Sequence, residues 1–249
     1  MENIQLYQGD CLEEMKNIPD KSVDMVLCDL PYGTTQNKWD SIIPLEPLWE
    51  QYKRIIKDNG AIVLFAQTPF DKVLGASNLK MLKYEWIWEK QQGTGFLNAK
   101  KMPLKKHENI LVFYKKLPVY NPQMIGNEIR TIKRNKNGKT TDNYGKFTYD
   151  EQSTYVGRYP TSILSFDRDK NKLHPTQKPV ALLEYLIKTY TNEGEIVLDN
   201  CMGSGSTGVA CININRKFIG IELEEKYFEM AKNRIEEAQN NKINIKEIE

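Results

Sequence analysis

The stretch EIVLDNCMGSGSTGVA, residues 195–210, decides the fold expected for this chain. An apolar run ends in a glycine-rich turn, and the turn leads directly into a predicted helix. Gly203, Gly205 and Gly208 satisfy the pattern G-x-G-x-x-G in the strand-turn-helix context that this pattern requires. Glu222 follows Gly203 by nineteen residues, at the end of the next predicted strand, where a carboxylate can accept hydrogen bonds from ribose hydroxyls. The stretch therefore predicts a site for a nucleoside-containing cofactor.

The glycine pattern alone does not choose between dinucleotides and S-adenosylmethionine (SAM). Only one strand-helix unit follows the turn, so a second mononucleotide-binding half cannot be built downstream. A single adenosine-type cofactor fits the remaining length better. In that case we expect Asp199 and the loop amides to contact the amino-acid part of the cofactor, and Glu222 to contact its ribose.

Predicted strands and helices alternate along most of the chain. We expect strands at 4–10, 22–29, 61–66, 83–90, 108–115, 195–200 and 217–222. We expect helices at 11–18, 44–56, 69–81, 179–190, 206–214 and 224–240. Such alternation implies parallel pairing with right-handed crossovers, so the predicted fold class is α/β with a doubly wound, mostly parallel sheet.

The composition fits one large domain that carries an insertion. The chain has 249 residues, of which 40% are hydrophobic and 27% charged. Its apolar runs are short and its N-terminus shows no basic region before an apolar stretch, so we expect no membrane span, no secretory signal and a cytoplasmic location. The cysteines and histidines are too scattered to predict a zinc site, and no metal is expected: Cys11, Cys28, Cys201, Cys211, His107 and His174.

The positive charge gathers in the middle of the sequence. Residues 115–172 hold twelve Lys or Arg against six Asp or Glu, whereas the whole chain carries a net charge of only +2. Aromatic residues are interleaved with these cations. Composition alone leaves two interpretations equally open, a solvated surface insertion or a nucleic-acid surface with cations for phosphates and aromatic rings for stacking. The candidate DNA-binding residues are Arg130, Lys133, Arg134, Lys136 and Lys139.

The tetrapeptide Asp29-Leu30-Pro31-Tyr32 follows the predicted buried strand at 22–29. By itself it is explained by an Asx turn before a proline. It closes the run GDCLEEMKNIPDKSVDMVLCDLPYG (9–33), which resembles the start of the DNA amino-methyltransferases, a family that methylates adenine N6 or cytosine N4 from SAM. The catalytic motif of that family reads [DNS]-P-P-[YFW].

Three further segments resemble the same family: KKHENILVFYK (105–115), LHPTQKPVALLEYLI (173–187) and LDNCMGSGST (198–207). The catalytic motif comes first, then a variable region, then the cofactor loop, which is the order of the β group. The chain departs from the family pattern in two places. Leu30 stands where proline is usual, and Asn200-Cys201-Met202 replaces the commoner Pro-Phe-x.

The resemblance implies a Rossmann-like methyltransferase fold with SAM as its cofactor. It divides the chain into a catalytic half (1–117), an inserted target-recognition region (118–172) and a cofactor-binding half (173–249). The cofactor-binding residues that it implies are Asp10, Cys11, Asp29, Thr176, Lys178, Asp199, Asn200, Cys201, Gly203, Ser204, Gly205, Ser206, Glu222 and Leu223. Asp10 is equally expected as a helix N-cap.

The chemistry of the residues agrees with this family. An exocyclic amine is a poor nucleophile because its lone pair is delocalised into the ring. The carboxylate of Asp29 and the carbonyl of Leu30 could accept both amine hydrogens and aim the lone pair at the methyl group. Pro31 biases Leu30 towards an extended conformation, and Tyr32 would stack on the base. The amine is out of reach inside a duplex, so the nucleotide must be flipped out.

These features predict a site-specific DNA methyltransferase of adenine N6, because Asp29 at the first motif position favours adenine over cytosine. The alternatives are an N4-cytosine methyltransferase, a nicotinamide- or flavin-dependent oxidoreductase, and a catalytically inactive DNA-binding protein. The expected partner is double-stranded DNA, and the resemblance allows for a homodimer and for a cognate restriction endonuclease. We expect a structural role for Glu108 and no nucleophilic role for Ser204 or Ser206.

Overall fold

The computed structural model describes residues 3–33, 40–133, 152–169 and 177–246. The chain divides into two compact units, one made of residues 1–121 with 162–249 and the other of residues 122–161. The first unit contains the large sheet and every helix of the described residues. The second contains a two-stranded antiparallel hairpin, β6 (Ile125–Lys133) with β7 (Gln152–Arg158).

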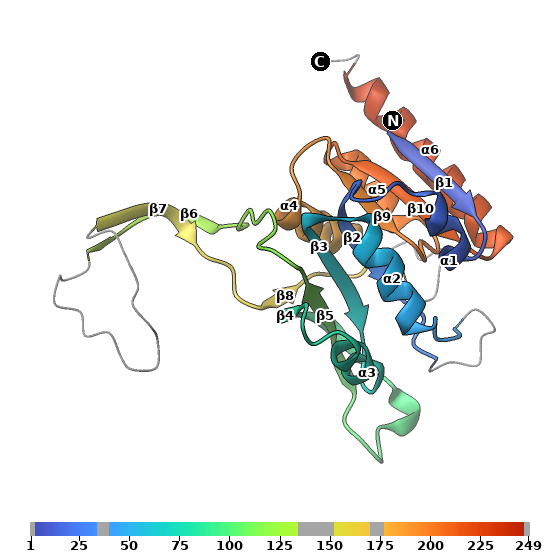
Figure 1. Ribbon diagram of the computed structural model, residues 1–249. Coiled ribbons are helices and arrows are strands. Elements are labelled where there is room, and N and C mark those ends of the chain that lie inside the picture. The colour runs from blue at the N-terminus through green and yellow to red at the C-terminus, as the bar shows by residue number, and fades with distance from the viewer. Residues whose placement is uncertain (1–2, 34–39, 134–151, 170–176, 247–249) are drawn as a thin grey trace. The chain divides into compact units, whose positions relative to one another are not determined.

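Eight strands of the described residues form the large sheet: β1 (Ile4–Gln8), β2 (Val23–Asp29), β3 (Ile56–Ala66), β4 (Leu82–Thr94), β5 (Lys105–Phe113), β8 (Ile163–Ser165), β9 (Ile196–Asp199) and β10 (Lys217–Glu222). Their order is β1-β10-β9-β2-β3-β5-β4-β8 (Figure 1). Neighbouring strands are parallel, except that β5 runs antiparallel to β3 and β4. The prediction of a doubly wound, mostly parallel α/β fold is confirmed.

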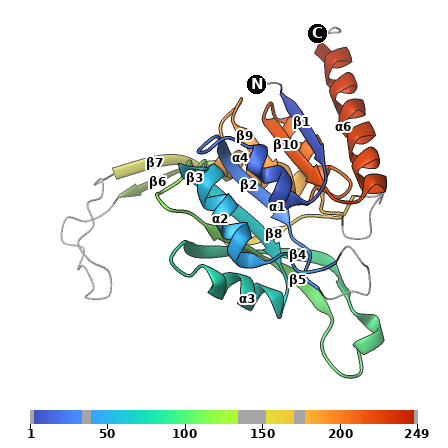
Figure 2. The ribbon, with the colours of Figure 1, turned by 45° about the vertical axis from the view of Figure 1, so that its right-hand side comes forward.

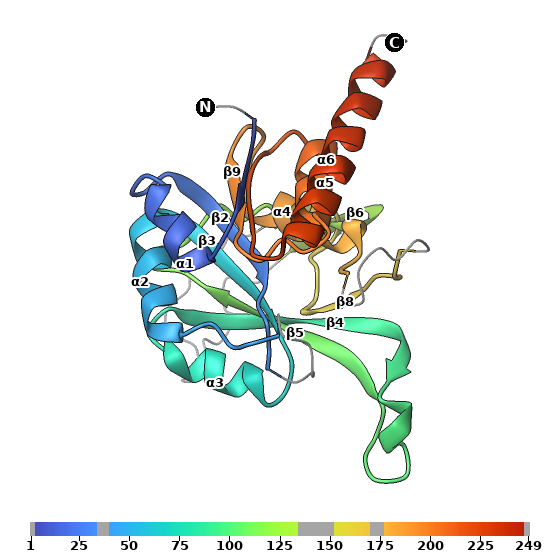
Figure 3. The same ribbon diagram turned by 90° about the vertical axis from the view of Figure 1, so that its right-hand side faces the viewer.

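Helices cover both faces of this sheet. They are α1 (Cys11–Glu14), α2 (Leu45–Ile55), α3 (Phe70–Ser77), α4 (Val180–Tyr190), α5 (Ser206–Asn213) and α6 (Glu225–Lys246), with short 3₁₀ turns at Met15–Asn17 and Phe96–Asn98. Figure 3 shows α1 and α2 on one side of the sheet and α4, α5 and α6 on the other, and Figure 2 shows α3 beside the strands β4 and β5.

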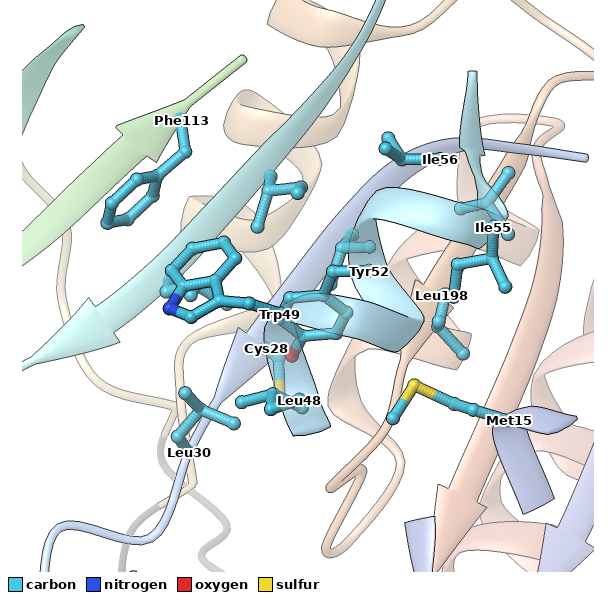
Figure 4. Packing of buried hydrophobic residues seen from close by; sticks show 14 of the residues in the cluster. Met15, Cys28, Leu30, Leu48, Trp49, Tyr52, Ile55, Ile56, Phe113 and Leu198 are labelled. Atoms are coloured by element: carbon cyan, nitrogen blue, oxygen red, sulfur yellow. The ribbon is translucent and has the colours of Figure 1, made fainter. Parts of the chain in front are cut away.

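The two layers follow from the alternation of side chains along each strand. On β2, Val26 and Cys28 belong to the hydrophobic cluster under α1, α2 and α3, whereas Met25 and Leu27 belong to the cluster under α4, α5 and α6. In the first cluster the ring of Trp49 lies 4.9 Å from the ring of Phe113, centroid to centroid (Figure 4). Every residue of β2 except the last is buried, including Asp24, whose carboxylate pairs with Lys57 and accepts from the amide of Ile196.

The start of β3 differs from the prediction. The strand expected at 61–66 already begins at Ile56, directly after α2, so the pair Asn59-Gly60 lies within β3. The register between β2 and β3 shifts at this point, and a Cβ on Gly60 would lie only 2.7 Å from the carbonyl oxygen of Asp24. The glycine therefore permits a close approach of two strands at a β-bulge. The same Asn-Gly pattern is also typical of a helix C-terminus, so the local sequence does not distinguish the two structures.

The segment expected as an insertion, 118–172, is not one structural body. Its strand Ile163–Ser165 pairs in parallel with β4 and so completes the large sheet. Residues 122–161 form the separate unit. Its hairpin, which carries exposed apolar residues among polar ones without regular alternation, was not expected as strands.

The parallel pairing of β2 with β9 places the two sequence motifs at one edge of the sheet. From β2 the chain continues to β3 on one side, and from β9 it continues to β10 on the other. Such a reversal of strand order opens a crevice at the carboxyl ends of the strands, where open α/β sheets bind their ligands. The turn at 29–32 follows β2 and the glycine turn follows β9.

The third glycine of the pattern, Gly208, lies where α5 packs closely against α6 and β10. A Cβ on Gly208 in α5 would lie 2.5 Å from Ile235 Cδ1 and 2.9 Å from Phe218 Cε1, both in fully buried side chains. We expect Gly208→Ala to lower the free energy of unfolding by about 1–3 kcal/mol, because the buried neighbours must shift. Urea titration with circular dichroism measures the change.

Gly75 in α3 provides the matched control. A Cβ there would meet Leu82 Cδ2 at 3.5 Å, which is ordinary contact. Gly75→Ala should leave stability unchanged or raise it by up to about 1 kcal/mol, since alanine favours the helix. Equal destabilisation by the two substitutions would contradict the close helix contact at Gly208.

Candidate active site

A cavity of about 500 Å³ lies at the carboxyl ends of β2, β9 and β10, a size typical of ligand pockets. The turn at 29–32 and the glycine turn both line it, as the sequence predicts. The predicted site residues on its wall are Asp10, Cys11, Asp29, Leu30, Pro31, Tyr32, Lys178, Asp199, Asn200, Cys201, Gly203, Ser204, Ser206, Glu222 and Leu223.

The remaining predicted residues fall elsewhere. Gly205 does not line the cavity: it has a φ of +76° at the start of α5, and a Cβ there would lie 3.0 Å from the Cβ of Ala231 on α6. Its role is to let the turn pass close to that helix. Arg130 and Lys133 belong to β6 in the separate unit. Thr176, Arg134, Lys136 and Lys139 lie outside the described residues.

Two carboxylates hold the glycine turn in shape. Asp199 at the end of β9 accepts hydrogen bonds from the hydroxyl of Thr207 at 2.6 Å and from the amide of Cys201 at 3.2 Å. Glu222 at the end of β10 accepts from the amides of Gly203 at 2.8 Å and Glu224 at 3.0 Å. These bonds fix both carboxylates on the cavity wall with their orientation set before any ligand binds.

Asp10 is the N-cap of α1, as expected, and it also lies on the cavity wall. Its carboxylate caps the helix by accepting from the amide of Leu12 at 2.8 Å. Asn200 also lines the cavity and accepts a 2.6 Å hydrogen bond from the hydroxyl of Tyr52 on α2. Burial raises the pKa of Cys28 in the adjoining core to about 12, so this thiol stays neutral.

Asp40 orders the turn at 29–32. Its side chain is buried, and one oxygen accepts hydrogen bonds from the amides of Tyr32 at 2.8 Å and Gly33 at 2.9 Å. The ring of Tyr32 stacks on Phe70 with centroids 5.4 Å apart, and its hydroxyl donates to Asp29 Oδ1 at 2.5 Å. The turn is therefore held through its backbone and through the side chain of Tyr32 together.

Four side chains of alternating charge form a chain of ion pairs that ends at Asp29. We call it the ion-pair network, and its members in order are Lys90, Glu108, Lys178 and Asp29. Lys178 pairs with Asp29 Oδ2 and also lies 3.2 Å from Glu108 Oε2. The other oxygen of Glu108 pairs with Lys90. The side chains of Lys90, Glu108 and Lys178 are each less than a tenth exposed.

Burial and pairing shift the pKa values in this network. Burial raises the pKa of Asp29, even though Lys178 opposes the shift. Burial alone would lower the pKa of Lys178, but the carboxylates of Asp29 and Glu108 outweigh it and raise that pKa. Burial likewise opposes ionisation of Glu108, yet Lys178 and Lys90 lower its pKa to about 2. Glu108 is therefore ionised at neutral pH, whereas Asp29 is the weaker acid of the two.

Sequence reasoning missed Asp40, Lys90 and the position of Glu108 in the cavity, although all three line it. A signal for two of them exists. Lys90 ends the predicted strand 83–90 and Glu108 begins the predicted strand 108–115. If two such strands pair antiparallel, as β4 and β5 do, these residues come to the same edge of the sheet. Asp40 carries no comparable pattern, because it reaches the turn from a loop.

The cavity suits a cationic adenosine derivative. Among the described residues its wall carries six acidic side chains against three basic ones. Burial raises the pKa of Asp199 to about 6 and raises that of Glu222 as well, so their negative charge is unfavourable without a partner. A sulfonium and an ammonium group would relieve this, whereas a pyrophosphate would add to the repulsion. The residues therefore fit SAM and fit a dinucleotide poorly.

Comparison with known proteins supports the same assignment. The family model for N6- and N4-specific methyltransferases, described as DNA methylase, matches residues 23–233. Type II methyltransferase M.HpaI of Haemophilus parainfluenzae is 30% identical over 93% of this chain and 74% of its own length. DNA adenine methyltransferase YhdJ of Escherichia coli is 30% identical over 94% of this chain and 83% of its own length.

Solved structures agree on the fold. The crystal structure of the M1.HpyAVI-SAM complex has a TM-score of 0.63 at 30% identity, and the alignment covers 93% of this chain and 99% of that one. The cytosine-N4-specific PvuII DNA methyltransferase has a TM-score of 0.69 at 16% identity, over 98% and 94% of the two chains, which supports the fold alone. The match of the family model over most of the sequence, with the motifs in the order of the β group, shows that this chain belongs to the DNA methylase family.

Proposed function

We propose that this protein transfers a methyl group from SAM to the exocyclic N6 of a flipped-out adenine in double-stranded DNA. The observation that carries the proposal is the shared cavity, in which Asp29 and Leu30 face the same space as the glycine turn and Glu222. Asp29 at the first position of the catalytic motif favours adenine. One relative at 30% identity is itself named a DNA adenine methyltransferase.

The acidic wall would hold the cofactor. SAM supplies a methyl group bound to a positively charged sulfur. Glu222 lies where a carboxylate accepts hydrogen bonds from ribose hydroxyls, and Asp199 supplies negative charge beside the glycine turn. Because the hydrogen bonds from Thr207 and the turn amides already fix both carboxylates, little ordering is left to occur on binding.

The turn at 29–32 would activate the amine. One oxygen of Asp29 and the carbonyl oxygen of Leu30 accept its two hydrogens and hold the lone pair towards the methyl group. Positive charge grows on the nitrogen during transfer, so acceptors fixed in advance stabilise the transition state more than the ground state. The alkylated nitrogen is acidic and releases its proton without a strong base. Asp40 keeps the turn in place through the amides of Tyr32 and Gly33.

Hairpin β6–β7 supplies candidate contacts to the DNA backbone. Arg130 and Lys133 lie on β6, where Arg130 pairs with Glu128 at 2.7 Å. A homodimer, a cognate restriction endonuclease and a cytoplasmic location remain predictions of the sequence. Sedimentation of the free protein and inspection of the adjacent genes test the first two. No helix in the described part of the chain is both long and apolar enough to cross a membrane.

Asp29 provides the direct test of the function. In single-turnover assays with SAM and duplex DNA, we expect Asp29→Ala to lower the transfer rate about a thousandfold and Asp29→Asn about a hundredfold, because asparagine keeps one acceptor. Asp58→Ala, at an exposed carboxylate, is the control and should leave the rate unchanged. Mass spectrometry of digested DNA should find N6-methyldeoxyadenosine. N4-methyldeoxycytidine would instead support the cytosine alternative, and no methylated base would overturn the proposal.

The ionised carboxylate of Asp199 should lower the stability of the ligand-free protein and strengthen the binding of SAM. Because its pKa is raised to about 6, the folded protein holds a proton between about pH 4 and pH 6 that the unfolded chain has lost. The free energy of unfolding therefore falls across this range as pH rises, by up to about 3 kcal/mol. Asp199→Asn should remove that fall and stabilise the ligand-free protein above about pH 6, while weakening SAM binding at least about tenfold. Urea titrations across this range and calorimetric titration with SAM measure both effects.

Lys133 tests the contact with the DNA backbone. We expect Lys133→Ala to weaken DNA binding about equally for all sequences and to reduce the slope of log K against log salt concentration by about 1. Lys16→Ala is the matched control, because Lys16 is exposed on the 3₁₀ turn after α1 and pairs with Glu13. Fluorescence anisotropy over a range of salt concentrations gives both slopes. Equal slopes for Lys133→Ala and the unaltered protein would argue against this contact.

A further inference from the structure

Both oxygens of Asp29 are occupied in the structure. Tyr32 donates to Oδ1 at 2.5 Å, and the ammonium of Lys178 pairs with Oδ2. An incoming amine needs one of these oxygens as an acceptor. The ammonium also cancels the negative charge that would stabilise the developing positive charge on the amine nitrogen. Withdrawal of Lys178 from Asp29 would therefore give the amine a more accessible and more negative acceptor.

Glu108 offers the ammonium a second acceptor within reach. Its Oε2 is buried and accepts no hydrogen bond from any residue that the structure describes, although Lys178 Nζ lies 3.2 Å away. The ammonium is thus an ion-pair partner of this oxygen without an aligned hydrogen bond to it, and a small shift of Lys178 towards Glu108 would complete that bond. Its Oε1 is already fixed by Lys90, which keeps the carboxylate from turning away.

The surroundings of Lys178 permit a short transfer. The ammonium lies 5.0 Å from the centre of the Phe65 ring and 6.0 Å from that of Tyr32, so aromatic faces flank it beside both acceptors. The three residues lie on separate segments of one compact unit: Asp29 at the end of β2, Glu108 within β5, and Lys178 just before α4. Movement of the flexible lysine side chain alone can exchange its partner.

We propose that Glu108 is a positioning residue for methyl transfer, which takes Lys178 from Asp29 when the target amine enters the cavity. Asp29 Oδ2 is then free for the amine, and the negative charge of Asp29 is no longer cancelled. Lys90 balances the charge of Glu108 throughout, so the exchange buries no additional unpaired charge. This inference depends on the amine-binding role proposed for Asp29.

A double-mutant cycle between Glu108 and Lys178 tests the exchange. Glu108→Gln should slow single-turnover methyl transfer about tenfold or more, with the affinity for DNA changed less than about twofold. In a Lys178→Met background the ammonium that must be moved is absent, so Glu108→Gln should then change the rate less than about twofold. An equal effect in both backgrounds, or no effect in the native background, would overturn the inference.

A second comparison guards against misfolding, because Glu108→Gln leaves Lys90 buried without its partner. Lys90→Met and Lys90→Met/Glu108→Gln both lack that unpaired ammonium. We expect the double variant to be at least about tenfold slower than Lys90→Met, at equal melting temperature, since only the double variant lacks the acceptor for Lys178. Equal rates for the two variants contradict the exchange.

The two proposals fail in different ways. If the unaltered protein does not methylate DNA, or if Asp29→Ala transfers as fast as the unaltered protein, the proposed function fails before Glu108 is considered. If Asp29 is required but the effect of Glu108→Gln does not depend on Lys178, the function stands and the exchange alone is wrong.

Discussion

The site depends on the parallel pairing of β2 with β9. These strands are about 170 residues apart in the sequence, yet Met25 aligns with Val197 and Val26 with Leu198. Their carboxyl ends consequently lie together, with Asp29 on one and Asp199 on the other. All the chemistry considered above uses this juxtaposition, because the acceptors for an amine follow one strand and the turn for a methyl donor follows the other.

The carboxylates at this edge of the sheet are buried or partly buried, and their ionised forms are destabilised by that burial. Burial raises the pKa of Asp29, Asp199 and Glu222, so each carboxylate is less stable ionised here than in water. Glu108 is the exception, because two ammonium groups surround it and lower its pKa. The site therefore separates Glu108 and Asp29, which have ammonium partners, from Asp199 and Glu222, which pair with no cation among the described residues and whose charge a cationic ligand would balance.

The sequence predicts the parts of the site that follow a strand directly. Asp29 and the glycine turn could be placed because each succeeds an apolar run, and strand-helix alternation fixes on which edge such turns lie. Asp40 could not, since it reaches the turn from a loop. Lys90 and Glu108 could be placed only by assuming that their strands pair antiparallel, which the sequence pattern does not establish. The bulge at Gly60 shows the same limit: Asn59-Gly60 has one local pattern for two structures, and the neighbouring strand decides between them.

The two residues that depart from the family motifs both contact helix α2. Leu30, which replaces a proline, is buried in the cluster that contains Leu48 and Trp49 of α2 (Figure 4). Asn200, which replaces another proline, accepts the hydrogen bond of Tyr52 on that helix. Proline at the first position would replace the leucine side chain in this cluster with a smaller ring, and at the second it would leave a buried hydroxyl without its acceptor. The two unusual motif residues therefore form one packing arrangement with α2, and both also line the cavity.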